Sequence, residues 1–266
     1  MTRQVSETTL EPLVIKYGGS VMTDAAARTA MASKIDTLSD YAPIVVHGGG
    51  PFIKQALADA AVESRFVRGL RVTDDISLPI IEKTLTYLNK QLAQAFRAAV
   101  GLTGRDAQVM RATPLAELGL VGDVTEVNTA LLQLLLEHHL TPVIACLAAP
   151  ETPLSAHDKG IYNVNADSAA GAVAGALAAP VVFLSDVAGV LEDPNDADSL
   201  IRRLNSAAIR ERIADGRIAG GMIPKVEAAL HALAKGAAFA VIADGRDAEH
   251  LEDALNSRSG TTIVSE

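Results

Sequence analysis

Short apolar runs alternate with segments of helical period along this chain. Five of the runs are rich in Val and Ile and are bounded by Pro, Gly or charge, which is the pattern of strands covered on both faces. These five are residues 12–16, 42–46, 141–146, 180–185 and 238–243. Residues 107–111 and 121–127 predict two further strands on weaker grounds. Between the runs, apolar residues recur at spacings of three and four, most clearly from Leu78 to Phe96, which predicts helices that bury one face.

Three more helices are predicted, two of them from local end signals. Asn128 is a candidate N-cap for residues 129–139, and Gly236 is a candidate stop for residues 222–235. A helix over residues 166–178 consists almost wholly of Ala, Gly and Val, so it can approach a sheet closely.

Alternation of strand and helix predicts right-handed crossovers and an α/β fold, a three-layer αβα sandwich with a mainly parallel central sheet. Three prolines between residues 142 and 161 mark the candidate seam, which predicts two lobes, residues 1–161 and residues 162–266. Ligands of such sheets bind beyond the carboxyl ends of the strands. The turns that follow each strand are therefore the place to search for function.

Composition narrows the class of protein. The 266 residues carry a net charge of −9 without a Lys/Arg block, which argues against a nucleic-acid partner. No apolar run approaches the roughly 18–20 residues that span a bilayer, and the start of the chain is polar, so no membrane segment or secretory leader is predicted. The one cysteine, Cys146, allows neither an internal disulfide nor a Cys-based zinc site, and the carboxylates of residues 193–198 lack EF-hand spacing. We predict no protein-held metal and a cytoplasmic location.

The first strand-end turn reads V-I-K-Y-G-G-S. Lys16 ends a buried strand, and Gly18 and Gly19 let the backbone turn sharply with free N–H groups, an arrangement that binds phosphate. The competing interpretation, which this turn alone favours, is a strand-terminal lysine that reaches solvent before an ordinary turn.

The second turn reads V-V-H-G-G-G-P. Three successive glycines and then Pro51, which suits the first turn of a helix, place free amides at a positive helix terminus. Three glycines lose much chain entropy on folding, so a turn with only a structural role would seldom contain all three. We therefore favour anion binding here. His47 is interpreted as a packing or orienting residue rather than as a base. Neither turn matches G-x-x-x-x-G-K-[ST] or G-x-G-x-x-G, which argues against a Walker-type NTPase and a dinucleotide fold.

Three other segments carry candidate chemistry. Arg71, in R-G-L-R-V-T-D-D, is suited to a substrate carboxylate or equally to a salt bridge with Asp74 or Asp75. Asp167 either complements a helix dipole or holds cationic groups in place, and the two roles are compatible. The loop that begins at residue 186 either holds a nucleotide or merely turns.

Lys225 is the most informative single position. The segment G-G-M-I-P-K places it in the first turn of a helix, where the dipole disfavours a cation by about 0.3–1 kcal/mol. A lysine in that place indicates an anion that both the helix and the ammonium group attract.

Six of these motifs, in this order, resemble the amino acid kinase family: V-I-K-Y-G-G-S, V-V-H-G-G-G-P, G-L-R-V-T-D, Y-N-V-N-A-D, L-S-D-V-A-G-V-L and G-G-M-I-P-K-V-E-A-A-L. The resemblance runs from about residue 13 to residue 264. It implies a kinase of arginine biosynthesis that uses MgATP to phosphorylate the side-chain carboxylate of N-acetyl-L-glutamate. Other kinases of the family match less well: aspartate kinases carry long regulatory tails, and uridylate and carbamate kinases have different first motifs. A kinase for an aminoadipate derivative and a non-catalytic metabolite sensor are the alternatives.

The resemblance assigns roles by position. Lys16 and Lys225 match the two lysines that stabilise the transferring phosphoryl group, and Asp167 matches the acid that organises them. The amino-acid contacts, in the N-terminal lobe, match Gly49, Gly50, Arg71 and Asn163, the last two facing the α-carboxylate. Nucleotide-binding candidates in the C-terminal lobe are Asp186, Val187, Ala188, Gly189, Val190, Leu191, Arg217, Ile218 and Ala219. Gly18 and Gly19 of the first turn join them as phosphate-binding candidates.

The implied reaction fits these residue types. A carboxylate acceptor is already ionised at neutral pH, so no general base is needed. The obstacle is repulsion between the acceptor and the phosphates, which two lysines, glycine amides and Mg²⁺ on the nucleotide would offset. The resemblance also bears on assembly, because family members inhibited by arginine carry a longer N-terminal helix for hexamer assembly. Here about a dozen residues precede the first strand, and the C-terminal N-S-R-S-G-T-T-I-V lacks the signature associated with arginine sensing. We therefore expect a homodimer rather than a hexamer.

Overall fold

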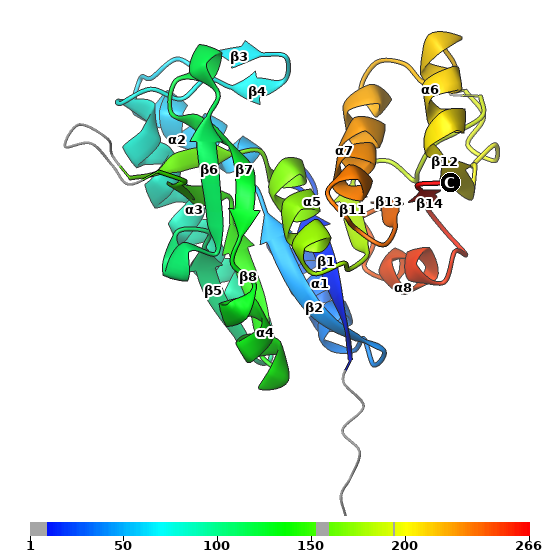
Figure 1. The fold of residues 1–266 in the computed structure, drawn as a ribbon, viewed down its shortest axis with the longest axis horizontal. Helices are drawn as coiled ribbons and strands as arrows, with labels where there is room; N and C mark the ends of the chain where they lie inside the picture. The colour runs from blue at the N-terminus through cyan, green and yellow to red at the C-terminus, as the bar shows by residue number, and fades with distance from the viewer. Residues whose placement is uncertain (1–9, 153–159, 194) are drawn as a thin grey trace, which may run out of the picture.

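The computed structural model describes residues 10–152, 160–193 and 195–266 and contains an eight-stranded sheet (Figure 1). The strand order is β12-β14-β13-β11-β1-β2-β8-β5, and every neighbouring pair is parallel except β13 and β14. The strands are β1 (Glu11–Tyr17), β2 (Tyr41–His47), β5 (Ala99–Thr103), β8 (Thr141–Ala145), β11 (Val181–Ser185), β12 (Arg203–Asn205), β13 (Ala240–Asp244) and β14 (Thr261–Val264). All five strands expected from the apolar runs lie in this sheet, which confirms an α/β fold with a mainly parallel sheet.

Helices cover both faces of the sheet. On one face, Val14 and Ile44 belong to the core that includes residues of α4, α5, α6 and α7. On the other face, Leu13 and Ile15 belong to the core that includes residues of α1, α3 and α8. The helices are α1 (Ala25–Asp36), α3 (Ser77–Ala93), α4 (Ala130–Glu137), α5 (Ala166–Ala176), α6 (Ser206–Ala214), α7 (Met222–Ala234) and α8 (His250–Leu255). Because successive side chains of a strand point to opposite faces, a sheet covered on both faces requires continuous apolar runs.

Two smaller β units complete the fold. Four strands close a small barrel: β6 (Met110–Pro114), β7 (Val121–Val127), β9 (Leu147–Pro150) and β10 (Tyr162–Val164). Strands β3 (Phe66–Val67) and β4 (Leu70–Arg71) form a hairpin, seen at the top of Figure 1, and α2 (Gly50–Asp59) packs on α3. Strand β1 lies between β2 and β11, so one sheet runs through both expected lobes, and the boundary after residue 161 stays a prediction.

The structure differs from the sequence-based expectation at short elements. The strand expected at residues 107–111 overlaps a 3-10 turn, Asp106–Gln108, and only its end enters β6. The carboxylate of Asp106 accepts a hydrogen bond from the backbone N–H of Thr103 at 2.7 Å, and Ala107 has a φ of +48°, so the chain turns here instead of extending. Strands β3, β4, β9, β10 and β12 have four residues or fewer, too few for a periodic pattern to register.

Small residues bring α5 and α7 into close contact. A Cβ atom added at Gly171 would lie 3.0 Å from the Cβ of Ala232, and one added at Gly175 would lie 2.6 Å from the carbonyl carbon of Lys235. Gly236, with a φ of +106°, follows the end of α7 and confirms the predicted stop. No helix in the described ranges is both long enough and apolar enough to cross a membrane.

Candidate active site

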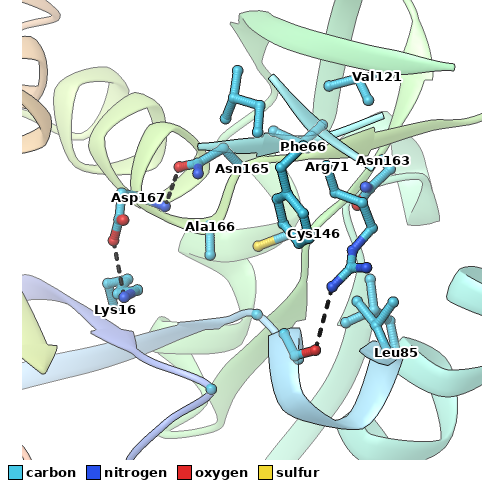
Figure 2. A pocket seen from close by; sticks show the side chains of 17 residues that line it. Lys16, Phe66, Arg71, Leu85, Val121, Cys146, Asn163, Asn165, Ala166 and Asp167 are labelled. Carbon is cyan, nitrogen blue, oxygen red and sulfur yellow. Dashed lines mark hydrogen bonds and ion pairs between the residues drawn. The ribbon is translucent and has the colours of Figure 1, made fainter. Parts of the chain in front are cut away.

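A pocket of about 200 Å³ opens at the carboxyl ends of β1 and β2 (Figure 2). Its walls come from the turns that follow these strands, the start of α5, the β3–β4 hairpin and the small barrel. Seven residues singled out in the sequence line it: Lys16, Gly19, Gly49, Gly50, Arg71, Asn163 and Asp167. The pocket therefore lies where the topology of a parallel sheet places ligand sites.

An ion pair stands at one end of the pocket, as Figure 2 shows. Lys16, near the end of β1, places its Nζ 3.0 Å from Oδ1 of Asp167, the second residue of α5; the two side chains are 14% and 33% exposed. Asn165 is the N-cap of α5, and its Oδ1 accepts hydrogen bonds from the backbone N–H groups of Asp167 and Ser168 at 2.9 and 3.0 Å. The cap fixes the start of the helix, the helix fixes the carboxylate, and the carboxylate orients the ammonium group.

The two glycine turns touch each other beside this pair. A Cβ atom at Gly19 would lie 2.8 Å from Cδ of Pro51 and 2.9 Å from the backbone N of Gly50, and one at Gly49 would lie 2.9 Å from a methyl group of Leu85. Neither position has room for a side chain. Gly49 is the N-cap of α2 and Gly50 its first residue, so the turn presents backbone amides at the positive end of a helix.

Arg71 lies at the other end of the pocket (Figure 2). Its Nη2 donates to the carbonyl oxygen of Gly50 at 3.4 Å, its Nη1 donates to the hydroxyl of Ser64, and its guanidinium group stacks 4.6 Å above the ring of Phe66. Burial lowers the pKa of Arg71, but a guanidinium group stays charged at neutral pH. The carboxylate of Asp74 accepts the backbone N–H of the residue three positions on, at the start of α3, at 2.7 Å. This geometry holds the guanidinium group in the pocket wall, and a guanidinium group is suited to a carboxylate.

A second cavity of about 20 Å³ adjoins the first, with Lys16 and Asp167 lining both. Lys225, the fourth residue of α7, also lines the small cavity, and its Nζ lies 3.2 Å from Oδ1 of Asp186 at the end of β11. The side chain of Lys225 is 29% exposed, and its ammonium group lowers the pKa of Asp186. Two cations from opposite ends of the chain thus face one small space beside the larger pocket.

The two segments expected to contact the nucleotide lie close together. Residues 186–191 form the loop after β11, in which Gly189 has a φ of +147° and would place a Cβ atom 2.6 Å from Oγ1 of Thr261. Arg217 pairs with Glu192, directly after this loop, at 2.7 Å between Nη1 and Oε1. The structure therefore joins the two segments through one ion pair, while their contact with a nucleotide stays a prediction.

His47 and Cys146 are buried and neutral at pH 7. Burial lowers the pKa of His47 to about 4 and, with the nearby charge of Asp167, raises that of Cys146 to about 12. The ring nitrogens of His47 bond Gly48 and Asn89, which confirms the packing or orienting interpretation. Among the described residues, no group of three His, Cys, Asp or Glu side chains could hold a metal ion.

Several residues of the two cavities were not singled out in the sequence. Phe66, Leu70 and Val121 form apolar parts of the large pocket, and Ser185 lines the small one. The motif L-S-D-V-A-G-V-L contains Ser185, and a polar residue at the end of a buried strand is a signal that sequence reasoning can use. Phe66 and Val121 carry no comparable signal, because only the folded hairpin and barrel bring them to the pocket.

Comparisons with known proteins agree with this geometry. The model of the amino acid kinase family matches residues 11–244. The chain is 48% identical to an acetylglutamate kinase from Deinococcus radiodurans over 95% of this chain and all of that one, and 44% identical to one from Thermus thermophilus over 88% and 91%. A structure of a carbamate kinase from Giardia, 17% identical, superimposes with a TM-score of 0.72 over 97% of this chain and 100% of its own, which shows the shared fold. The chain therefore belongs to the amino acid kinase family and, within it, to the acetylglutamate kinases.

Proposed function

We propose that the protein transfers the γ-phosphoryl group of ATP to the side-chain carboxylate of N-acetyl-L-glutamate, a step of arginine biosynthesis. The observation that carries the proposal is the pair of adjoining cavities that share Lys16 and Asp167, with Lys225 facing the smaller one. A carboxylate substrate in the larger pocket and a terminal phosphate beside Lys16 and Lys225, next to the smaller cavity, would meet at the shared wall.

The larger pocket suits an N-acylated acidic amino acid. Arg71 offers a fork of donors to the α-carboxylate at one end, and Asn163 lines the wall nearby, its Nδ2 donating to Oγ1 of Thr73 at 3.0 Å. The side-chain carboxylate would then point to Lys16 at the other end. Leu70 and Val121 provide the apolar surface that an acetyl group requires.

Catalysis here is positioning and charge stabilisation. The acceptor carboxylate attacks the γ-phosphorus as an anion, and the bond to the bridging oxygen of ADP breaks, so no proton has to move. Lys16, Lys225 and the amides of the glycine turns lie where negative charge gathers during the transfer. Asp167 holds the ammonium group of Lys16 at 3.0 Å and so fixes the geometry before the substrates arrive.

Magnesium belongs to the nucleotide in this proposal. No trio of possible ligands exists among the described residues, and Mg²⁺ is usually held by one or two carboxylates together with substrate phosphates, so the ion would enter bound to the phosphates. Asp167, which lines the small cavity, and Asp186, 3.2 Å from the ammonium group of Lys225, are the carboxylates that would face such an ion. The bound ion supplies charge neutralisation of the phosphate chain.

The proposal also includes the division of the substrates between the lobes, the location of the reaction and the oligomeric state. The amino acid would bind to the lobe of residues 1–161 and ATP to the lobe of residues 162–266, with Asp186 to Leu191 and Arg217 to Ala219 around the nucleotide. We place the reaction in the cytoplasm, in keeping with a single buried thiol, and expect a homodimer.

A hydroxylamine trap tests the function directly, because hydroxylamine converts an acyl phosphate to a coloured hydroxamate complex with iron. Purified protein and MgATP are supplied in turn with N-acetyl-L-glutamate, glutamate, aspartate and N-acetylaminoadipate. We expect the highest kcat/KM with N-acetyl-L-glutamate. A preference for the aminoadipate derivative would reassign the substrate, and the absence of hydroxamate with all four would favour a metabolite sensor.

A further inference from the structure

Asn89 is a buried polar residue of α3 that belongs to none of the sequence motifs. Its Nδ2 donates to the carbonyl oxygen of Val143 at 2.8 Å and lies 3.0 Å from Nε2 of His47. The contact with a carbonyl oxygen requires the amide NH₂ group at this position, because the amide oxygen cannot donate. The same NH₂ group therefore donates to His47, and Nε2 of the imidazole is the acceptor.

This contact decides the tautomer of His47. A neutral imidazole that accepts at Nε2 carries its proton on Nδ1. Nδ1 lies 2.8 Å from the carbonyl oxygen of Gly48, so it donates to that oxygen. The ring is fully buried, and burial lowers the pKa of His47 to about 4, which keeps the ring neutral at pH 7.

The bond to Gly48 sets the direction of an amide at the pocket. A trans peptide is planar, so the carbonyl of Gly48 and the N–H of Gly49 point in opposite directions. With the carbonyl held against the buried imidazole, the N–H of Gly49 points away from that imidazole, and both glycines line the pocket. The thiol of Cys146 donates to the carbonyl oxygen of His47 at 3.1 Å, so the preceding peptide is held as well.

The fold makes room for this arrangement. Gly101 of β5 faces Asn89, and a Cβ atom at Gly101 would lie 2.5 Å from the Oδ1 of Asn89. The bond from Asn89 to Val143 ties α3 to β8, while His47 ends the neighbouring strand β2. The glycine turn is thus supported from one helix and two strands.

We propose that Asn89 and His47 are positioning residues: Asn89 sets the tautomer of His47, and His47 holds the peptide between Gly48 and Gly49 with its N–H turned to the substrate pocket. The proposal rests on the proposed function for the identity of the substrate, but the hydrogen-bond geometry is independent of it.

The tautomer is measured without any assay of activity. Protein labelled with ¹⁵N in its six histidines is examined at pH 7 by two-bond ¹⁵N–¹H correlation, and the signal lost in His47→Asn identifies residue 47. We expect a neutral ring protonated on Nδ1 in the wild type. A ring protonated on Nε2, or an imidazolium, would overturn the proposal.

A matched pair of variants tests the effect on catalysis. In His47→Asn the amide nitrogen takes the place of Nδ1 and still donates to Gly48, whereas in His47→Gln the amide takes the place of Nε2 and does not. We expect His47→Gln to lower kcat/KM for N-acetyl-L-glutamate by about 10- to 100-fold with little change in KM for ATP, and His47→Asn to recover at least about tenfold of that loss. Equal kcat/KM values in the two variants, or a parallel rise in KM for ATP, would contradict the proposal.

The proposed function and the positioning role of Asn89 and His47 can be refuted separately. A wild-type protein that has the Nδ1-protonated ring but forms no acyl phosphate refutes the proposed function alone. An active enzyme with the other tautomer refutes the positioning role alone. The tautomer measurement needs only the wild-type fold, so a failure of the variants to fold leaves the proposal open to refutation.

Discussion

Replacing Lys225 by alanine tests the convergence of two cations on the transferred phosphoryl group. Lys16 and Lys225 both line the small cavity, so Lys225→Ala removes one of two ammonium groups and leaves the carboxylate of Asp186 without its partner at 3.2 Å. Loss of one preorganised electrostatic donor costs about 10²–10³-fold in kcat, roughly 3–4 kcal/mol. We expect a fall in kcat of at least about 10²-fold. Because Lys225 does not line the larger pocket, KM for N-acetyl-L-glutamate should change little.

Two further variants separate the causes of that loss. Lys235→Ala removes a lysine at the end of the same helix that lines neither cavity, and its kcat should stay within about twofold of wild type. In the double variant Lys225→Ala/Asp186→Asn the carboxylate is no longer charged. If the unpaired charge of Asp186 caused most of the loss, the double variant would recover; we expect it to remain at least about 10²-fold below wild type.

Initial rates of hydroxamate formation, with both substrates varied, give kcat and both KM values for each variant. A thermal unfolding curve for each protein shows that the fold is intact. Near-normal kcat in folded Lys225→Ala would refute the assignment of this lysine to the transferred phosphoryl group. A large rise in KM for the amino acid with normal kcat would move Lys225 into the substrate pocket instead.

Three other outcomes follow from the geometry. Arg71→Ala should raise KM for N-acetyl-L-glutamate by at least about tenfold, since it removes a charged donor, and leave KM for ATP unchanged in steady-state kinetics; a shift in KM for ATP would reverse the lobe assignment. Because the pKa of His47 is lowered to about 4 in the fold from 6.5, the unfolded chain binds this proton first, so its contribution to stability is complete above pH 6.5 and is lost as the pH falls toward 4, at up to about 1.4 kcal/mol per pH unit. Urea unfolding at a series of pH values should show this slope in wild type and a smaller one in His47→Asn; identical slopes would contradict it. Gly175→Ala should lower the free energy of unfolding by about 1–3 kcal/mol, since the new methyl group would meet the backbone of Lys235, and an unchanged urea midpoint would show that α5 and α7 are not in close contact.

Much of the candidate site follows from strand-end chemistry. The glycines after β2 are identified by their place at the end of an apolar run, while Lys16 needs the family resemblance as well, because its turn alone favours an ordinary strand end. The carboxyl ends of neighbouring parallel strands share one edge of the sheet. Lys225 was identified because a cation in the first turn of a helix needs an anion to explain it. These signals are local, so they can be recognised in the sequence before the fold is known.

Only the tertiary structure shows which lysine forms an ion pair with which carboxylate. By resemblance, Asp167 was expected to organise both lysines, and that role stays a prediction; the ion pairs present are Lys16 with Asp167 and Lys225 with Asp186. A choice between two carboxylates separated by about twenty positions depends on where β11 and α7 lie in the fold, which no local pattern encodes.

The sequence by itself determined the fold class, five of the eight strands of the central sheet and the chemistry offered at their ends, because side-chain burial on two faces leaves a local and periodic record. Only the tertiary structure decided that Phe66 of a two-residue strand lines the pocket and that Asn89 reaches His47 from a separate helix. Such contacts join residues tens of positions apart through short elements and single hydrogen bonds. The energy of such a contact depends on the hydrogen-bond angle and on differences of a few tenths of an ångström in distance. This geometry forms only once the layers have packed.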